Sequence, residues 1–460
     1  MRTAIETARD RFAGKRVTVV GLAREGMSLV RFLVEAGATV TANDRATADR
    51  LAGTLAAMED LPVRWELGGH PREVFVEADV IFVSPGVPLQ LPPLVDARQR
   101  GVAISSETQL FFELCPGQIV GITGSAGKTT TTALTGAILR EAGLPVYVGG
   151  NIGVPLLDRL ADIGPGDRVV LEMSSFQLEA LPYSPPIAAI LNLTPNHLDR
   201  HGDMDSYVAA KINIVRYQRP GDWAILNADD PITSTIEPRG DSLWFSLQRP
   251  VEGSYLEDDR VLLCRGGSVE KVCGVADVLL RGRHNLANVV AAVALASAAG
   301  APTDAMRAAI RGFHGVPHRL EIVDEVDGVV YCNDSIATAP ERAIASMQSF
   351  HEPIVLIAGG RNKKLPMDAW AEVIRRRARA LVLMGESTQE IEQAVLAAGG
   401  PDLPRIVRVS SMEEAVEVAR TVAVPGDVVL LAPGCTSFDM FRDFEERGER
   451  FRQCVRQLRS

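Results

Sequence analysis

The stretch GITGSAGKTTTT, residues 121–132, decides how the middle of this chain folds. Glycines, small side chains, a lysine and a hydroxyl are the residue types from which phosphate-binding loops are built. In the common form, G-x-x-x-x-G-K-[ST], the first glycine would stand where this chain has Ile122, so the loop is a shortened version. A strand-like run, QIVGIT, precedes it and a helical run follows it, which is the context that a phosphate loop requires.

The shortened loop predicts a grip for the phosphates of ATP. Backbone N–H groups of a Gly-rich turn and the N-terminus of the next helix attract phosphate oxygens. We expect Lys128 to reach the terminal phosphates and the hydroxyl of Thr129 to bind Mg²⁺. The alternative is an ordinary strand-to-helix turn, which we favour less because Gly127, Lys128 and Thr129 all stand at working positions. The predicted ATP-binding residues of the loop are Gly124, Ser125, Ala126, Gly127, Lys128, Thr129 and Thr130.

Polar residues end two other strand-like runs of the same region. Glu172 ends RVVLE and His197 follows AAILNLTPN. Carboxyl ends of parallel strands open onto the crevice where ligands bind, and Mg²⁺ prefers oxygen ligands. Taken singly, Glu172 could be a solvated carboxylate and His197 a structural histidine; together, after a phosphate loop, they indicate a metal site.

Short strands alternate with helical runs along the chain, which predicts an α/β fold with parallel sheets. We expect three domains: a Rossmann-like N-terminal domain (1–105), a central domain with a P-loop ATPase-type parallel sheet (106–316), and a doubly wound C-terminal α/β domain (317–460). The first contains GLAREG, residues 21–26, a degraded relative of the dinucleotide-binding glycine motif.

Composition narrows the class of protein. The chain has 460 residues and a formal net charge of −10, which argues against a general nucleic-acid or anionic-membrane surface. Its six cysteines have no C-x-x-C spacing. No apolar run approaches the roughly 18 residues of a membrane span. We expect a cytoplasmic, reduced monomer that binds neither nucleic acid nor membrane.

Several motifs, in order, give the chain a resemblance to a known family. They include TGSAGKTTTT, EMSSFQLE, LNLTPNHLDRHG, AAKINI, NADDP, PHRLE, NDSIATAPE and APGCTSFDMFRDFEERG. From residue 120 to the end the chain resembles the ATP-dependent Mur ligases, whose phosphate loop has this shortened form. SSFQLE and the terminal motif resemble the members that add glutamate.

The resemblance implies a reaction in peptidoglycan precursor synthesis, the pathway that supports cell-wall growth, cell shape and cell division. ATP would phosphorylate the carboxylate of UDP-N-acetylmuramoyl-L-alanine, and the amine of glutamate, D-glutamate in the preferred interpretation, would attack the acyl phosphate. Phosphorylation turns a poor leaving group into a good one, so catalysis is mostly positioning and charge stabilisation.

The resemblance also assigns roles by motif. Lys128, Glu172, His197 and Lys211 are the implied catalytic residues, and two magnesium sites are implied. Thr129, Glu172 and His197 resemble metal ligands, as does Lys211 once CO₂ has converted its amine to a carbamate; an ammonium cannot bind Mg²⁺. Without the motif, Lys211 would be taken for a solvated helix lysine. The implied nucleotide contacts beyond the loop are Asn285, Asn288, Arg319 and Asp334.

The implied substrate contacts fall into three groups. Those for the acceptor are Asn151, Ser174 and Gln177, and those for the incoming glutamate are Thr338, Lys363, Ser437 and Phe444, with His318 adjacent to the nucleotide contacts. The uridine diphosphate part is expected on the first domain, with Arg24, Asp44, Arg45 and Ser84 as candidates. A structural or surface role remains the alternative for each of them.

One motif departs from the family pattern. NDSKAT, which is typical of the family, reads NDSIAT here, with Ile336 in place of a lysine. Loss of that cation leaves the handling of the amino acid, and the choice between D- and L-glutamate, open. Lys364, Arg361 and Arg342 are the cations available to replace it.

Two alternatives to glutamate addition stay open. One is another amino-acid-adding ligase of the superfamily, L-glutamate-specific or similar to folylpolyglutamate synthase. The other is a nucleotide-binding regulator without ligation chemistry. A regulator would release phosphate without the amino acid, whereas a ligase would require both acceptor and amino acid.

Overall fold

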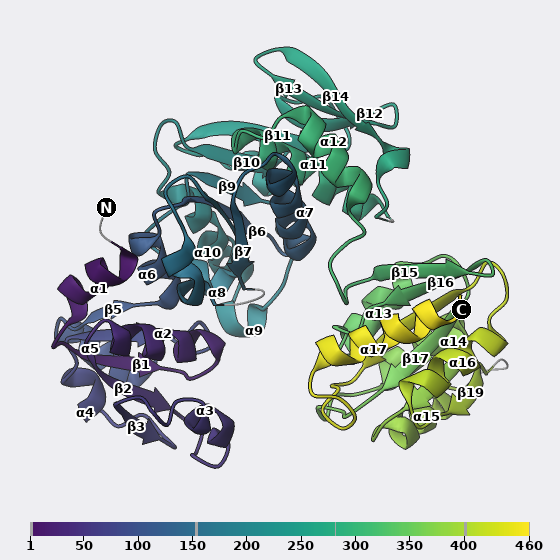
Figure 1. Ribbon diagram of the computed structural model, residues 1–460, viewed down its shortest axis with the longest axis horizontal. Coiled ribbons are helices and arrows are strands. Elements are labelled where there is room, and N and C mark those ends of the chain that lie inside the picture. The colour runs from purple at the N-terminus through teal and green to yellow at the C-terminus, as the bar shows by residue number, and fades with distance from the viewer. Residues whose placement is uncertain (1–2, 152–154, 281, 400–402, 460) are drawn as a thin grey trace. The chain divides into compact units, whose positions relative to one another are not determined.

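The computed structural model describes residues 3–151, 155–280, 282–399 and 403–459, which fall into two compact units, Met1–Phe313 and His314–Ser460 (Figure 1). Three sheets account for the strands of these ranges: two in the first unit and one in the second. This confirms the predicted α/β class. Among the helices of the described ranges, none combines the length and the apolar character of a membrane span.

The N-terminal sheet is parallel, with strand order β3-β2-β1-β4-β5. Alternate residues of its central strand face opposite layers: Val17 and Val19 pack with α1 and α2, whereas Val20 packs with α4 and α5. The elements are α1 (Ala4–Phe12), β1 (Arg16–Val20), α2 (Arg24–Glu35), β2 (Thr39–Asp44), α3 (Ala52–Ala56), β3 (Val63–Leu67), α4 (Glu73–Val76), β4 (Val80–Val83), α5 (Pro92–Gln99), β5 (Ala103–Ser105) and α6 (Glu107–Leu114).

The central sheet has nine strands in the order β14-β13-β12-β11-β10-β9-β6-β8-β7. Pairing is parallel from β7 to β12, and β13 and β14 add an antiparallel hairpin that the sequence analysis did not anticipate. Its elements are β6 (Gln118–Thr123), α7 (Lys128–Glu141), β7 (Val146–Gly150), η1 (Leu156–Asp162), β8 (Arg168–Glu172), α8 (Ser175–Leu178), β9 (Ile187–Ile190), α9 (Leu198–His201), α10 (Met204–Arg216), β10 (Trp223–Asn227), η2 (Thr233–Thr235), β11 (Asp241–Ser246), β12 (Gly253–Glu257), β13 (Arg260–Arg265), β14 (Ser268–Gly274), η3 (Val275–Asp277), α11 (Arg283–Ala298) and α12 (Thr303–Gly312).

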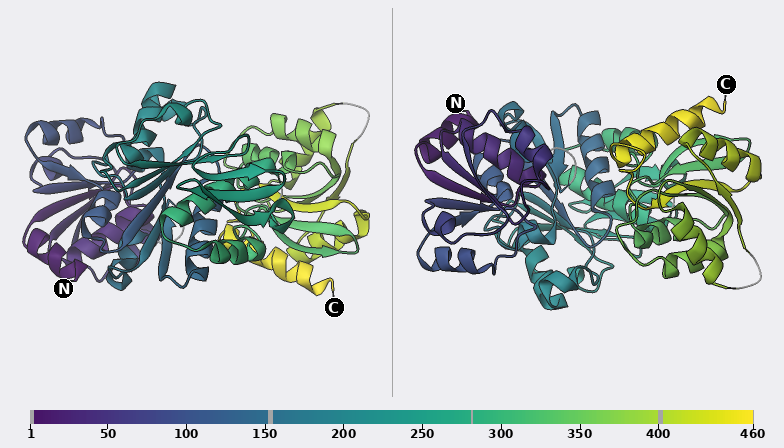
Figure 2. Two further views of the ribbon diagram at one scale, coloured as in Figure 1. Left: turned by 90° about the horizontal axis from the view of Figure 1, so that it is seen from above. Right: turned by 90° about the horizontal axis from the view of Figure 1, so that it is seen from below.

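The order of these strands positions the site. Strands β9, β6 and β8 are neighbours and run in the same direction, so the residues that follow them gather at one edge of the sheet. The phosphate loop follows β6, Glu172 ends β8, and Asn192 lies just beyond β9. Helices α7 and α11 cover one face, where Val120 and Ile122 are fully buried, and α10 covers the other (Figures 1 and 2).

The second unit is a six-stranded sheet, β15-β16-β20-β17-β18-β19, parallel except for the edge pair β15–β16. Leu356 faces a core closed by α13, α14 and α15, and Val355 faces one closed by α16 and α17. The elements are β15 (Glu321–Val326), β16 (Val329–Asn333), α13 (Pro340–Gln348), β17 (Ile354–Gly359), α14 (Asp368–Arg377), β18 (Ala378–Met384), α15 (Thr388–Ala397), β19 (Arg405–Arg408), α16 (Met412–Val422), β20 (Val428–Gly434) and α17 (Phe444–Gln457).

Candidate active site

The loop between β6 and α7 needs glycine at its last position. Gly127 has φ 81° and stands directly before α7. A Cβ atom there would lie 2.2 Å from Oδ1 of Asn288, on α11. Left-handed backbone and close approach both exclude a side chain. The amine of Lys128 folds back over the loop and donates to the carbonyl of Gly124 (3.0 Å).

Two residues that the sequence analysis did not single out hold this loop. The backbone of Ser125 donates to Asn192 O (2.9 Å), and that of Ala126 donates to Asn192 Oδ1 (2.8 Å). The hydroxyls of Ser125 and Tyr207 are 2.8 Å apart. The N–H groups of Ser125 and Ala126 therefore donate to Asn192, whereas the sequence predicts that they face phosphate. Asn192 could have been found as one more polar residue just beyond a strand.

Glu172 joins the loop to the neighbouring strand end. Its side chain is buried, and Oε2 accepts a hydrogen bond from the hydroxyl of Thr129 (2.7 Å). Its other oxygen, Oε1, accepts from Nδ2 of Asn151 (3.0 Å), just after β7. One carboxylate thus contacts the helix that begins at the phosphate loop and a residue in the wall of the adjoining cavity.

Lys211 is buried beneath the same loop. Only 2% of its surface is exposed, and its amine donates to Thr123 Oγ1 (3.2 Å) and Gly124 O (3.0 Å). Burial is the main cause that lowers the pKa of Lys211 to about 7; Lys128 lowers it further and Glu172 opposes the shift. A substantial fraction of the amine is therefore neutral near neutral pH. The interpretation of Lys211 as a solvated helix lysine is wrong.

His197 lies beside a group of aromatic rings. Its backbone has φ 53°, and its ring centroid is 5.2 Å from that of Phe176. His201 stacks on the same phenyl ring at 5.1 Å, and its Nε2 is 2.9 Å from Ser175 Oγ. Burial lowers the pKa of His201, and His197 and Lys211 contribute to that shift, so these three groups share one neighbourhood.

The donor atoms suit Mg²⁺ in part. The hydroxyl of Thr129 and the carboxylate of Glu172 are hard oxygen ligands. Lys211 has only a nitrogen and fits as a ligand only after conversion to an anionic oxygen group. The described residues contain no cluster of three or more His, Cys, Asp or Glu side chains arranged for a metal.

A cavity of about 490 Å³ adjoins Glu172 on the side of the N-terminal sheet. It takes in the glycine-motif turn after β1, the end of β2, the turn after β4, and the strand ends of the central sheet. Of the residues predicted to contact the acceptor, the cavity wall contains Arg24, Asp44, Arg45, Ser84, Asn151 and Ser174. The structure thus brings six of the seven predicted positions together across two sheets of one unit.

Gln177 lies outside that wall and has a local role. Its backbone and side chain form a reciprocal cap with Ser174 at the start of α8, with Ser174 N donating to Gln177 Oε1 at 2.9 Å. Its amide Nε2 donates to Glu25 Oε1 on α2 (3.1 Å). Gln177 therefore ties the cavity floor to the N-terminal sheet.

Asn285 and Asn288, the nucleotide contacts predicted on α11, lie against the phosphate loop. Asn288 Nδ2 donates to Asn285 Oδ1 (3.0 Å), and Asn288 Oδ1 accepts from Thr131 Oγ1 (3.4 Å). The first unit thus places these amides beside Gly127.

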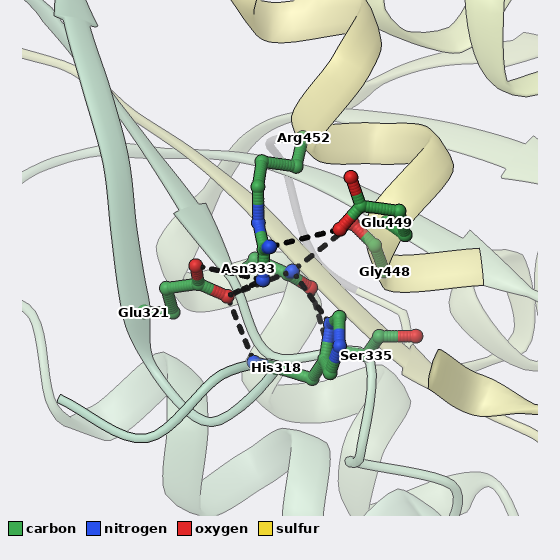
Figure 3. A network of polar contacts seen from close by, with 7 residues as sticks. All are labelled: His318, Glu321, Asn333, Ser335, Gly448, Glu449 and Arg452. Carbon is green, nitrogen blue, oxygen red and sulfur yellow. Dashed lines mark hydrogen bonds and ion pairs between the residues drawn. The ribbon is translucent and has the colours of Figure 1, made fainter. Parts of the chain in front are cut away.

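The remaining predicted nucleotide residues lie in the second unit, around the start of β15. His318 has φ 62°, and its N–H donates to Glu321 Oε2 (2.8 Å). Its Nδ1 lies 3.1 Å from the amide nitrogen of Asn333, which also contacts the carbonyl of Gly448 (Figure 3). Asp334 is buried and accepts from Leu320 N (3.0 Å) and from the hydroxyl of Ser346.

Burial is the main cause that raises the pKa of the Asp334 carboxyl, and Arg319 is among the groups that oppose the rise. The positive charge of Arg319 therefore acts on the Asp334 carboxyl.

The residues predicted to hold glutamate also lie in the second unit. Lys363 Nζ is 3.5 Å from Thr338 Oγ1. Phe444 begins α17, and its half-buried ring meets that of His318 edge-on, 6.3 Å away. Ser437 is buried and its carbonyl accepts from Phe441 N (2.8 Å).

Three family models match successive parts of the chain. They are described as the Mur ligase MurD-like N-terminal domain (residues 15–106), the Mur ligase middle domain (122–296) and the Mur ligase glutamate ligase domain (318–435).

Curated relatives match nearly the whole chain. A UDP-N-acetylmuramoylalanine--D-glutamate ligase of Symbiobacterium thermophilum is 45% identical, covering 96% of this chain and 98% of the relative. A Roseiflexus protein of the same name is 44% identical over the same shares.

Solved structures match in fold. UDP-N-acetylmuramate-alanine ligase of Thermotoga maritima has a TM-score of 0.56 at 21% identity, covering 96% of this chain and 100% of that one. The MurF ligase of the same organism, in complex with ADP, has a TM-score of 0.53 at 17% identity and full coverage of both chains.

Proposed function

The chain belongs to the Mur ligase family, and on that premise we propose that it joins D-glutamate to UDP-N-acetylmuramoyl-L-alanine with consumption of ATP. It is an ATP-dependent, amide-bond-forming ligase of peptidoglycan precursor synthesis. Its place of action is the cytoplasm and its working form is a monomer. The domain limits 1–105, 106–316 and 317–460 divide it into UDP-sugar, ATP and amino-acid domains.

The observation that carries the proposal is the position of Glu172. Its two oxygens accept hydrogen bonds from Thr129, at the phosphate loop, and from Asn151, in the wall of the 490 Å³ cavity. A nucleotide gripped by the loop and an acceptor lying in the cavity would therefore meet at this carboxylate. Proximity of γ-phosphate and acceptor carboxylate is what the formation of an acyl phosphate requires.

The residues of the first unit divide the work of phosphoryl transfer. Lys128 neutralises phosphate charge, and Asn285 and Asn288 help to hold the nucleotide. Thr129, Glu172, His197 and a carbamate on Lys211 would hold two magnesium ions, which supply positive charge to the phosphate oxygens. The hydrogen bonds of the buried Lys211 amine to Thr123 and Gly124 support the carbamate. They fix the amine beneath the loop, so the oxygens of a carbamate formed on it would point in one direction.

We assign residues of the second unit to further nucleotide contacts and to the incoming glutamate. Arg319 and Asp334, with His318 beside them, contact the nucleotide, and Thr338, Lys363, Ser437 and Phe444 hold the incoming glutamate. The cation lost at Ile336 is not replaced by Arg361, because that guanidinium makes two 2.8 Å hydrogen bonds to Glu386. Lys363, next to Thr338, is the cation that we assign to a glutamate carboxylate.

Phosphate release tests the proposal. With UDP-N-acetylmuramoyl-L-alanine and ATP present, we expect release only when D-glutamate is added, and little with L-glutamate or other amino acids. Release that needs no amino acid would favour a regulator, and turnover with L-glutamate or a folate acceptor would favour a sister ligase. An Ile336→Lys variant with unchanged D-glutamate turnover would show that Lys363 suffices.

A further inference from the structure

One imidazole in the wall of the acceptor cavity has no part in the reaction described above. His70 follows the turn after β3 and lines the cavity together with Asp44 and Arg45, at the end of the neighbouring strand β2. Its Nδ1 lies 2.7 Å from Oδ1 of Asn43, and its ring meets Phe75 edge-on at 6.2 Å. The ring is therefore held in one orientation by a polar contact and a packing contact.

The hydrogen bonds of Asn43 decide which nitrogen of His70 carries the proton. Asn43 is fully buried, and its amide nitrogen donates to the carbonyls of Glu66 and Gly69, each at 2.8 Å. Both N–H groups of that amide are used, so the other end is the oxygen, which can only accept. Nδ1 of His70 must then be the donor. In a neutral imidazole this leaves Nε2 as a bare acceptor.

The surroundings favour the neutral ring. Burial is the main cause that lowers the pKa of His70; Arg45 acts in the same direction and Asp44 opposes it. Nε2 has no hydrogen-bond partner among the residues that the structure describes. The oxygens of Asp44, by contrast, already accept from Leu22 N and Ala46 N, each at 2.8 Å.

The chemistry of the cavity fixes which part of a ligand meets His70. Asn151 and Ser174 mark the end that adjoins Glu172 and the phosphate loop. An acceptor whose carboxylate is phosphorylated must place that carboxylate at this end. Its nucleotide, at the other extremity of the molecule, then lies between the turn after β1 and His70, where Rossmann-like sheets bind nucleosides.

We propose that His70 is a specificity-determining residue for the nucleoside, with Nε2 accepting a hydrogen bond from a donor of uridine. That donor is the imide N3–H of the base or a ribose hydroxyl; both offer a hydrogen to a bare imidazole nitrogen. This inference rests on the proposed function, since it takes the acceptor to be linked to UDP. Cytidine, which has no N3–H, would lose the contact if the base provides it.

Calorimetric titration of the intact protein with UDP and three analogues tests the inference. The analogues are N3-methyl-UDP, 2′-deoxy-UDP and 3′-deoxy-UDP, each of which removes one donor. A single neutral hydrogen bond changes affinity by about three- to tenfold. We expect the wild-type protein to lose that factor with the analogue that lacks the partner of His70, and the identity of that analogue names the donor.

The His70→Ala variant completes a thermodynamic cycle, in which the side chain and the ligand's donor are removed singly and together. It should bind UDP about three- to tenfold more weakly and show no further loss with the same analogue. Phe75→Leu, which disturbs the packing of the ring but keeps Nε2, is the matched control and should retain the discrimination. Equal affinity of wild-type protein for all four nucleotides, or equal discrimination by His70→Ala, would overturn the inference. Wild-type protein that binds no uridine nucleotide would overturn the proposed function and the inference with it.

Discussion

Replacing Gly127 by alanine tests how the phosphate loop is built. An alanine at φ 81° costs about 1–2 kcal/mol of backbone strain. The new Cβ would lie 2.2 Å from Oδ1 of Asn288. Asn288 must then move, and its contacts with Thr131 and Asn285 are lost at about 1 kcal/mol each. We expect a total cost of about 3–4 kcal/mol, concentrated where ATP binds.

Gly143, two residues after the same helix, is the matched control. Its φ is 76°, but a Cβ there would meet no atom within 4 Å. Gly143→Ala should therefore lower the melting temperature slightly and leave the KM for ATP unchanged. Gly127→Ala should raise that KM at least about tenfold, as 1.4 kcal/mol of lost binding requires. Equal effects of the two substitutions in phosphate-release and thermal-unfolding assays would refute the role given to the Asn288 contact.

Three further predictions follow from buried groups. Burial raises the pKa of Glu107 to about 8, so the folded chain keeps a proton that the unfolded chain releases above pH 4.5. The stability of the folded state therefore falls as pH rises from 4.5 to about 8. In denaturant titrations, Glu107→Gln should flatten that pH dependence and be about 3 kcal/mol more stable than the wild-type protein near pH 7. Gly448→Ala would place a Cβ atom 2.1 Å from Nδ1 of His318 and force that ring to move. The NMR signal of His318 should therefore shift and ATP turnover should fall. An unchanged His318 signal would contradict the predicted displacement of the ring. Lys211→Ala should abolish turnover and remove the carbamate resonance that ¹³C-bicarbonate gives the wild-type protein; retained turnover would speak against the carbamate.

Strand-end chemistry made much of the site predictable from sequence. Glu172 ends one strand-like run and the loop residues follow another; the parallel pairing of these runs could be inferred, and the structure brings the residues together. Asn192 and Tyr207 escaped notice for different reasons. Asn192 was visible as a polar residue beyond a strand, whereas Tyr207 reaches the loop only because α10 packs across the sheet, one turn before Lys211.

Other features lay beyond local sequence signals. The antiparallel strands β13 and β14 lack the alternation with helices that identifies the rest of the central sheet. His70 gains meaning only from the amide of Asn43, whose two donors are fixed by carbonyls 23 and 26 residues away in the chain. Contacts of that kind depend on tertiary packing, which propensity and periodicity do not describe.

Isotope transfer tests the central claim most directly. If Glu172 brings the γ-phosphate of ATP to the acceptor's carboxylate, an oxygen of that carboxylate becomes the bridging atom and leaves with phosphate when the amine of glutamate attacks. UDP-N-acetylmuramoyl-L-alanine labelled with ¹⁸O in both carboxylate oxygens should yield inorganic phosphate carrying one ¹⁸O atom and an amide that keeps the other. Phosphate free of ¹⁸O would contradict the transfer.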